Sequence, residues 1–357
     1  MDLREEFPVF ERLAYLNAGT DGPVPRRAAD AATERLRQEL TGGRSGRAHF
    51  DALLEGAQEL RLRIASLIGA DERGVALTRS TTDGVNTVLS SLPLGRGDEV
   101  LTSDEEHPGL LAPLAVARRR KGFDVRFVPF DELASEVRPR TKLVACSHVS
   151  WVGGKVAPAE IAHTDVQVLL DGAQGLGAVP VRVRELGCDF YAASGQKWLC
   201  GPDGTGYLYA RPDRADSLDP PWPGYGSLED AQQPFELAVH PGARRFDLGI
   251  SPGPVTAWAR AAFEVLASAG WDSVFDRAAT LASALADRLA ERGLDVAPRG
   301  RSTLVSWRSA DPEADVLRLA EVGIVVRYLP ARGLVRASVG AWSNEDDIER
   351  LLTHVVS

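Results

Sequence analysis

The chain has 357 residues, of which 44% are hydrophobic and 25% charged, a composition typical of a globular protein with one large domain or two of ordinary size. Asp and Glu outnumber Lys and Arg by 50 to 41, and the net charge of −9 argues against non-specific binding of nucleic acid. No apolar run approaches the roughly 20 residues of a membrane helix, and the acidic start lacks the apolar core of a signal peptide, so we expect a cytoplasmic protein that binds neither nucleic acid nor membrane.

Short apolar segments alternate with helical patterns through the first two-thirds of the chain. Residues 74–80 and 98–103 are predicted strands, and each is followed by a predicted helix, at 81–92 and 108–122. Further strands are predicted at 124–130, 141–150, 166–175, 188–194 and 205–212. Several of these runs are apolar almost throughout, which is typical of strands buried on both faces. The alternation predicts a mostly parallel sheet with helices on both faces.

The last third of the chain has a different pattern. Residues 211–234 are rich in Pro, Gly and Asp, which predicts a long surface excursion. Two long helical patterns follow, at 255–270 and 271–293, and the tail alternates strand and helix again. The tail indicates a second, smaller α/β unit. We expect a large domain of residues 15–250 and a small domain made of residues 1–14 and 251–357.

Polar side chains follow the strands of the expected large domain, and the carboxyl ends of parallel strands meet at one crevice. In chain order they are Ser80, Thr81, Thr82, His107, Ser150, Asp171, Gln174, Ser194, Gln196 and Lys197. Singly they have plain structural interpretations as helix caps, turn residues and a surface lysine. Together they offer complementary chemistry. Hydroxyls at a helix N-terminus bind phosphate, an imidazole stacks on a ring, a buried carboxylate holds a pyridine nitrogen protonated, and a buried lysine forms an imine.

Those parts describe a pyridoxal 5′-phosphate (PLP) site, and the segments that carry them resemble class V aminotransferase-type enzymes. This group includes cysteine desulfurases, selenocysteine lyases and isopenicillin N epimerase. The matching segments are YLNAGTDGPVP, RSTTDGVNTV, SDEEHPGLLAPL, LLDGAQGLGAVPV, DFYAASGQKWLCGPDGTGYLY, RRFDLG and LVRASVGAWSNEDDIERLL. The segments with Asp171 and Lys197 are the specific ones. The resemblance spans nearly the whole chain and implies an α/β fold, the PLP-dependent transferase fold of the aspartate aminotransferase type (fold type I).

The resemblance also implies a role for each matching position. Three residues would be catalytic: Lys197 would form the Schiff base with PLP, Asp171 would bind the pyridine nitrogen, and His107 would stack on the ring. Gln174 would approach the phenolic oxygen of the cofactor. The phosphate would be bound by Thr81, Thr82, Ser194 and Gln196. No metal is implied.

Two residues would bind the substrate, a free α-amino acid. Arg336 would clamp its α-carboxylate, for which a planar guanidinium is suited, although a strand arginine in a surface ion pair is the alternative. Asn17, in the opening segment, would also contact the substrate. The resemblance further implies a homodimer in which residues of the RRFDLG segment cross to the partner. The stretch with Arg44, Arg47 and His49 either reaches the partner's pocket or is a basic solvent-exposed loop.

The chain departs from the desulfurase pattern at several positions. Trp151 follows Ser150 where desulfurases often carry Asn, and Gln196 precedes the lysine where they carry His. Ile250 stands where the family commonly has a phosphate-binding Thr from the partner subunit, and Ser251 is a candidate replacement.

The cysteines bear most directly on function. Desulfurases place a sulfur-accepting cysteine on a loop that corresponds to residues 327–336, which is short here and has no cysteine. The three cysteines, Cys146, Cys188 and Cys200, are scattered, which argues against disulfides and a metal site. We therefore expect a PLP-dependent β-lyase that cleaves C–S or C–Se bonds without a catalytic cysteine. The sequence leaves open an aminotransferase, an amino-acid epimerase and a non-catalytic PLP-fold binding module.

Overall fold

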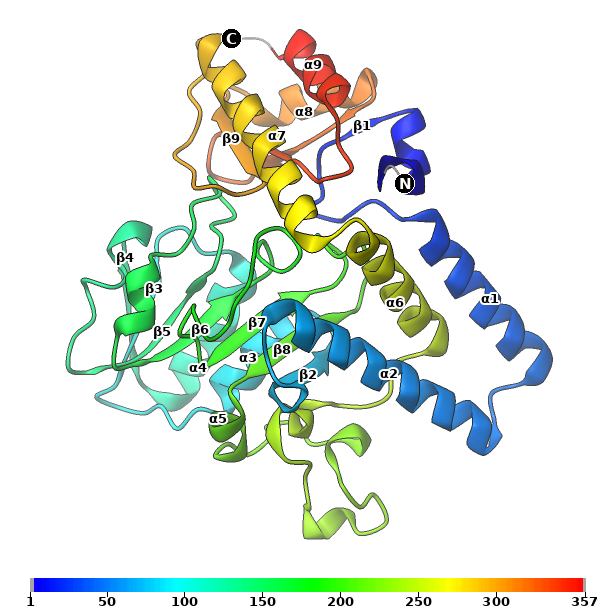
Figure 1. Cartoon of the computed structure of the whole chain (residues 1–357). Helices are drawn as coiled ribbons and strands as arrows, with labels where there is room; N and C mark the ends of the chain where they lie inside the picture. The colour runs from blue at the N-terminus through cyan, green and yellow to red at the C-terminus, as the bar shows by residue number, and fades with distance from the viewer. Residues whose placement is uncertain (1–2, 356–357) are drawn as a thin grey trace.

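The computed structural model describes residues 3–355 and has a seven-stranded sheet at its centre, with strand order β2-β8-β7-β6-β5-β3-β4 (Figure 1). The strands are β2 (Val75–Thr78), β3 (Glu99–Ser103), β4 (Asp124–Val128), β5 (Thr141–Ser147), β6 (Gln167–Asp171), β7 (Phe190–Ser194) and β8 (Gly206–Ala210). Within this described sheet, β8 alone runs in the direction opposite to the other strands. The expected mostly parallel α/β fold is confirmed.

Helices cover both faces of this sheet. Successive residues of a strand point to opposite faces, so each strand contributes side chains to both of the apolar layers. In β5, for example, Leu143 and Ala145 join one apolar cluster, and Val144 and Cys146 join the other. The first cluster includes α3 (Thr81–Ser91) and α4 (Pro108–Lys121), and the second includes α2 (Gly46–Ile68) and α6 (Gly253–Ser268). The sheet is therefore the middle layer of three.

Two segments project from this body. The helix α1 (Arg26–Gly42) packs along α6, and together with α2 it forms an arm on one side of the molecule (Figure 1). Residues 211–250 contain a short helix, α5 (Pro212–Asp216), and otherwise only 3-10 turns, and they extend beyond the lower edge of the sheet in Figure 1. The surface excursion expected from the Pro- and Gly-rich sequence lies here.

A second unit is built on an antiparallel sheet with strand order β11-β12-β9. Its strands are β9 (Leu304–Arg308), β11 (Arg327–Leu329) and β12 (Leu334–Ser338), and its helices are α7 (Trp271–Glu291), α8 (Pro312–Glu321) and α9 (Glu345–His354). The N-terminal strand β1 (Ala14–Tyr15) joins this unit by pairing in parallel with β10 (Ile324–Val325).

The expected domain boundary after residue 250 stays a prediction. The apolar side chains of α6, which follows that boundary, pack with α2 in the core of the large unit, whereas α7 carries the chain into the small unit from Leu281 onwards. Within residues 3–355, no helix combines the length and the apolar character that crossing a membrane would require.

Candidate active site

A cavity of about 240 Å³ lies where the carboxyl ends of β2, β3, β5, β6 and β7 meet the small unit. It is lined by these residues expected from the sequence: Thr81, Thr82, His107, Asp171, Gln174, Ser194, Gln196, Lys197 and Arg336. Asn17 does not line it; instead, its Oδ1 accepts a hydrogen bond from Thr20 Oγ1 at 2.8 Å. The sequence did not assign a role to three further lining residues, Thr20, Trp151 and Arg327.

The start of α3 supplies hydroxyl groups to one end of the cavity. Ser80 caps the helix, since its Oγ accepts a hydrogen bond from the Asp83 N–H at 3.1 Å. Thr81 Oγ1 and, from the end of β7, Ser194 Oγ are buried and have no hydrogen-bond partner in the described part of the chain. Buried hydroxyls normally find a partner. Unpaired hydroxyls beside free helix N–H groups make this end of the cavity suited to an anion.

His107 begins the helix α4 and is held as a neutral imidazole. Its Nδ1 accepts a hydrogen bond from the Gly109 N–H at 3.0 Å, so the ring caps the helix. Burial, with help from Lys197 and the arginines of the cavity, lowers the pKa of His107 to about 4. The ring of Trp151 meets the imidazole edge-on, with centroids 5.0 Å apart, which fixes the plane of His107.

Asp171 and Lys197 bring a carboxyl group and an amine to the same cavity. Burial raises the pKa of Asp171, but the Ala173 N–H at 2.9 Å from Oδ1 and the charge of Lys197 act in the opposite direction and favour the carboxylate. Burial lowers the pKa of Lys197 to about 8, against the pull of Asp171. A substantial fraction of the amine is therefore neutral near physiological pH, as a nucleophilic or basic lysine requires.

The side-chain amide of Gln174 is held from both ends. Its Oε1 accepts a hydrogen bond from Trp198 Nε1 at 3.0 Å, and its Nε2 donates to the Gly19 carbonyl at 2.8 Å. A Cβ at residue 19 would lie 2.9 Å from Gln174 Oε1 and 2.9 Å from Arg336 Nη2, so a larger residue there would displace these two side chains. The segment around Gly19 thereby closes the cavity over these two side chains.

Two arginines face the same cavity. Arg327 on β11 pairs in register with Arg336 on β12, so both side chains leave the same face of the hairpin. Arg336 is fully buried; its Nη1 donates to the Trp151 carbonyl at 2.8 Å, while Nε and Nη2 have no partner within residues 3–355. Arg327 is half-buried and donates through Nη1 to Thr20 Oγ1 at 3.1 Å. The alternative of a surface ion pair for Arg336 is therefore wrong.

All three cysteines are buried and none lines this cavity. Burial raises the pKa of each thiol, to about 12 for Cys188. Only four residues, 330–333, connect β11 to β12. A thiolate that could reach a substrate in the cavity is thus absent from the described residues.

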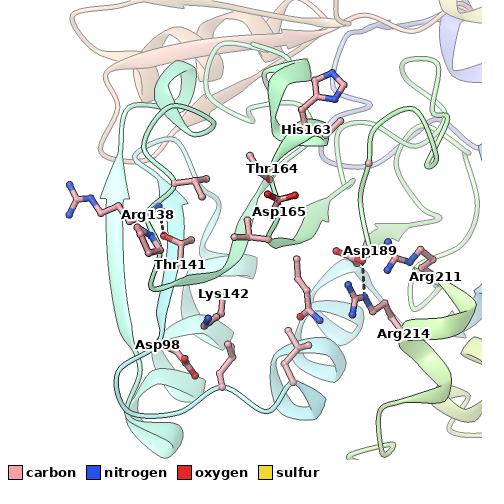
Figure 2. Close-up of a pocket in the computed structure, with 18 of the residues that line it drawn as sticks. Asp98, Arg138, Thr141, Lys142, His163, Thr164, Asp165, Asp189, Arg211 and Arg214 are labelled. Atoms are coloured by element: carbon pink, nitrogen blue, oxygen red, sulfur yellow. Dashed lines mark hydrogen bonds and ion pairs between the residues drawn. The ribbon is translucent and has the colours of Figure 1, made fainter.

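A larger cavity of about 1110 Å³ opens at the other end of the strands (Figure 2). Its charged side chains include Lys142 at the start of β5 and Asp189 before β7, and they lie spread around the walls rather than converging. Asp189 is already paired with Arg211 at 3.0 Å and Arg214 at 3.1 Å. The smaller cavity therefore remains the candidate active site, because its polar groups converge and lack partners.

Comparisons with known proteins found matches over nearly the whole chain. Residues 14–351 match the family model described as aminotransferase class-V. A cysteine desulfurase of Cronobacter sakazakii (strain ATCC BAA-894) is 30% identical, over 99% of this chain and 97% of its own length. An isopenicillin N epimerase of Amycolatopsis lactamdurans is also 30% identical, over 98% of this chain and 96% of its own.

Solved structures of one further protein, C-DES, cover nearly the whole chain. The complex between the cystine C–S lyase C-DES and its reaction product cysteine persulfide has a TM-score of 0.91 and 28% identity, and covers 97% of this chain and 98% of that one. A C-DES mutant with glycine covalently linked to the PLP cofactor has a TM-score of 0.92 and 28% identity, and covers 98% of both chains.

Proposed function

The chain belongs to the aminotransferase class-V family, and on that premise we propose that it is a carbon–sulfur lyase for disulfides formed by two amino acids, of which cystine is the simplest. It is a PLP-dependent enzyme, as its family is. The observation that carries the finer proposal is the pair Arg327 and Arg336 in one cavity, because two guanidinium groups match a substrate with two carboxylates. C-DES, which is similar over nearly the whole chain, is a cystine C–S lyase.

The residues of the cavity fit PLP. The unpartnered hydroxyls of Thr81 and Ser194 and the start of α3 suit a phosphate dianion, and the buried carboxylate of Asp171 suits a protonated ring nitrogen. We assign the phosphate to Thr81, Thr82, Ser194 and Gln196. His107 would lie against the ring, Gln174 would approach the phenolic oxygen, and Lys197 would bind the cofactor covalently.

PLP, when bound, supplies an electron sink for the bond that breaks at the substrate Cα. The chain supplies the groups around that bond. Lys197 Nζ takes the Cα proton, which its lowered pKa of about 8 permits near neutral pH. The Ala173 N–H and the charge of Lys197 favour the carboxylate form of Asp171 against the effect of burial, and this carboxylate would face the positive charge of the ring nitrogen. Arg336 orients the Cα substituents by binding the α-carboxylate through Nε and Nη2, its two free donors.

The reaction balances without an oxidant or an added thiol. The bond between Cβ and sulfur breaks, and sulfur leaves with the bonding electron pair as the persulfide of the distal cysteine. One water molecule converts the remaining three-carbon fragment into pyruvate and ammonia. Cystine and water thus give cysteine persulfide, pyruvate and ammonia. No protein thiol takes part, which agrees with the burial of Cys146, Cys188 and Cys200.

The products test this proposal directly. Holoenzyme incubated with L-cystine is expected to release pyruvate and ammonia in equal amounts, together with a cyanide-reactive persulfide. A keto acid without ammonia, with the cofactor left in its amine form, would instead identify an aminotransferase. A D-amino acid product would identify an epimerase, the activity of the Amycolatopsis relative. No turnover of any amino acid would point to a binding module.

The same assay tests the absence of a catalytic cysteine. We expect the variant Cys146→Ala, Cys188→Ala and Cys200→Ser to keep its turnover within a fewfold of wild type, because none of these thiols lines the cavity. Cys146→Ala alone serves as a control for packing loss, since this side chain is fully buried in the core of the large unit. A persulfide trapped by alkylation on Cys200, with activity lost in Cys200→Ser, would contradict the cysteine-free route.

We further propose that the enzyme acts as a homodimer. Large apolar side chains are exposed on the α1–α2 arm, where Leu40 is 82% exposed, and on the excursion, where Phe235 is fully exposed. Within RRFDLG, by contrast, the Asp247 carboxylate forms an ion pair with Arg61 of the same chain, at 2.7 Å. Residues 44–48 are exposed and His49 is half-buried; they lie at the junction of α1 and α2 and include the first turn of α2, and both interpretations of them stay open. Sedimentation at assay concentrations should give a dimer; a fully active monomer would contradict this.

A further inference from the structure

We propose that Asp21 determines substrate specificity by binding the ammonium group of the distal half of the substrate, beside Arg327, which binds the distal carboxylate. This inference rests on the proposed function, in which the substrate is a disulfide of two amino acids. The distal half of such a substrate ends in one cation and one anion. A site that recognises it needs a fixed group of each charge at the mouth of the cavity.

The backbone around Asp21 is packed onto the lysine segment. Gly19 and Thr20 line the cavity, and Asp21 follows them directly. The Gly22 N–H donates to the Gln196 carbonyl at 2.7 Å, and a Cβ at Gly22 would lie 2.0 Å from the Lys197 carbonyl oxygen. These contacts hold the backbone of Asp21 next to Thr20, which is part of the cavity wall.

The carboxylate of Asp21 has no protein partner. The residue is exposed, and within residues 3–355 its side chain makes neither a hydrogen bond nor an ion pair. Only its backbone is used: the N–H donates to the Asn17 carbonyl at 3.3 Å, and the carbonyl accepts from Tyr15 Oη at 2.9 Å. Glu105, which follows β3 near the cavity, is by contrast paired with Lys155 at 3.2 Å. An unpaired carboxylate at this position is available to a ligand.

Arg327 stands close to Asp21 but is not paired with it. Arg327 is hydrogen-bonded to Thr20, the residue next to Asp21, and forms no ion pair in the described chain. The charges of Lys197 and Arg327 both act to lower the pKa of Asp21, although burial and Asp203 raise it overall. The two opposite charges therefore lie within electrostatic range at the mouth, and each is free to bind the opposite charge on a single amino-acid head group.

Three disulfides and three variants test the assignment. The substrates are L-cystine, the mixed disulfide of L-cysteine with 3-mercaptopropionate, which lacks the distal amino group, and that with cysteamine, which lacks the distal carboxylate. Wild-type holoenzyme is expected to prefer cystine over the deamino disulfide by about fivefold in kcat/KM, mostly through KM, as suits a partly exposed ion pair. Asp21→Asn should reduce this ratio to near one, and Asp21→Glu, which keeps the charge, should restore part of it.

Asp203→Asn is the matched control. Asp203 is an exposed carboxylate that acts electrostatically on Asp21 but does not line the cavity, so its loss should leave the cystine preference at the wild-type value. Arg327→Gln should instead reduce the preference for cystine over the cysteamine disulfide. The assignment is overturned if Asp21→Asn keeps the wild-type ratio, if Asp203→Asn reduces it equally, or if the wild type has no preference for the amino group. Failure of the wild type to cleave any of the three disulfides would instead overturn the proposed function.

Discussion

Lys197→Ala is expected to lower turnover by about 10³-fold or more, because the change removes both the covalent attachment of the cofactor and the base that takes the Cα proton. No other lysine lines the cavity, so no neighbouring amine in the described chain can replace it. The phosphate contacts are left in place, and the variant should still bind PLP reversibly. Borohydride reduction and mapping of the labelled peptide provide the measurement, with the label on Lys197 in wild type and absent from the variant.

Lys142→Ala is the matched control for this change. Lys142 lines the larger cavity at the opposite end of the strands, so its loss removes a lysine without touching the candidate active site (Figure 2). Its activity and labelling should match the wild type. A Lys197→Ala protein that is still labelled by reduction, on any residue, would show that the cofactor is attached elsewhere.

Much of the sheet could be predicted from sequence because its strands are buried on both faces. Residues 188–194 are a near-continuous apolar run and correspond to β7, and the predicted strand at 98–103 corresponds to β3. The predicted strand at 141–150 is too long, since β5 ends at Ser147 although Val149 beyond it is also buried. An apolar run in the sequence indicates that the residues are buried. It does not distinguish a strand from a buried loop that follows it.

The helix α1 was not predicted from the sequence. In its sequence, RRAADAATERLRQELTG, the apolar residues are mostly alanines, the larger Leu36 and Leu40 are exposed, and only Ala28 is buried. A helix that packs along one other helix, as α1 packs along α6, needs a smaller apolar face than a helix that covers a core.

The sequence predicted those site residues that directly follow a strand of the large sheet. Thr81, Asp171 and Lys197 meet because parallel strands place their carboxyl ends together. Arg327 and Asp21 depend instead on the register of a hairpin and on the packing of a turn, neither of which local composition reveals. Pairing the hairpin about residues 330–333 would have placed Arg327 opposite Arg336. The role of Asn17 stays a prediction.

Asp171→Asn should lower turnover by about 10²- to 10³-fold while leaving the protein folded and able to bind PLP. Asparagine has nearly the same shape, and its oxygen can still accept the hydrogen bond that Ala173 N–H gives to Asp171 at 2.9 Å. What is lost is the negative charge that would keep the ring nitrogen of the cofactor protonated. The kcat for cystine gives the size of the effect, and the PLP content and thermal unfolding midpoint of the variant serve as controls.

A second measurement separates this electrostatic role from a merely structural one. Asp171 raises the pKa of Lys197, which burial lowers to about 8. Without the carboxylate the lysine should lose its proton at a lower pH, so the neutral amine is present over a wider range. The rate at which apoenzyme captures PLP increases as Lys197 loses its proton. In Asp171→Asn this increase should therefore occur at a lower pH than in wild type. An unchanged pH profile together with turnover close to that of wild type would remove Asp171 from its assigned place at the ring nitrogen.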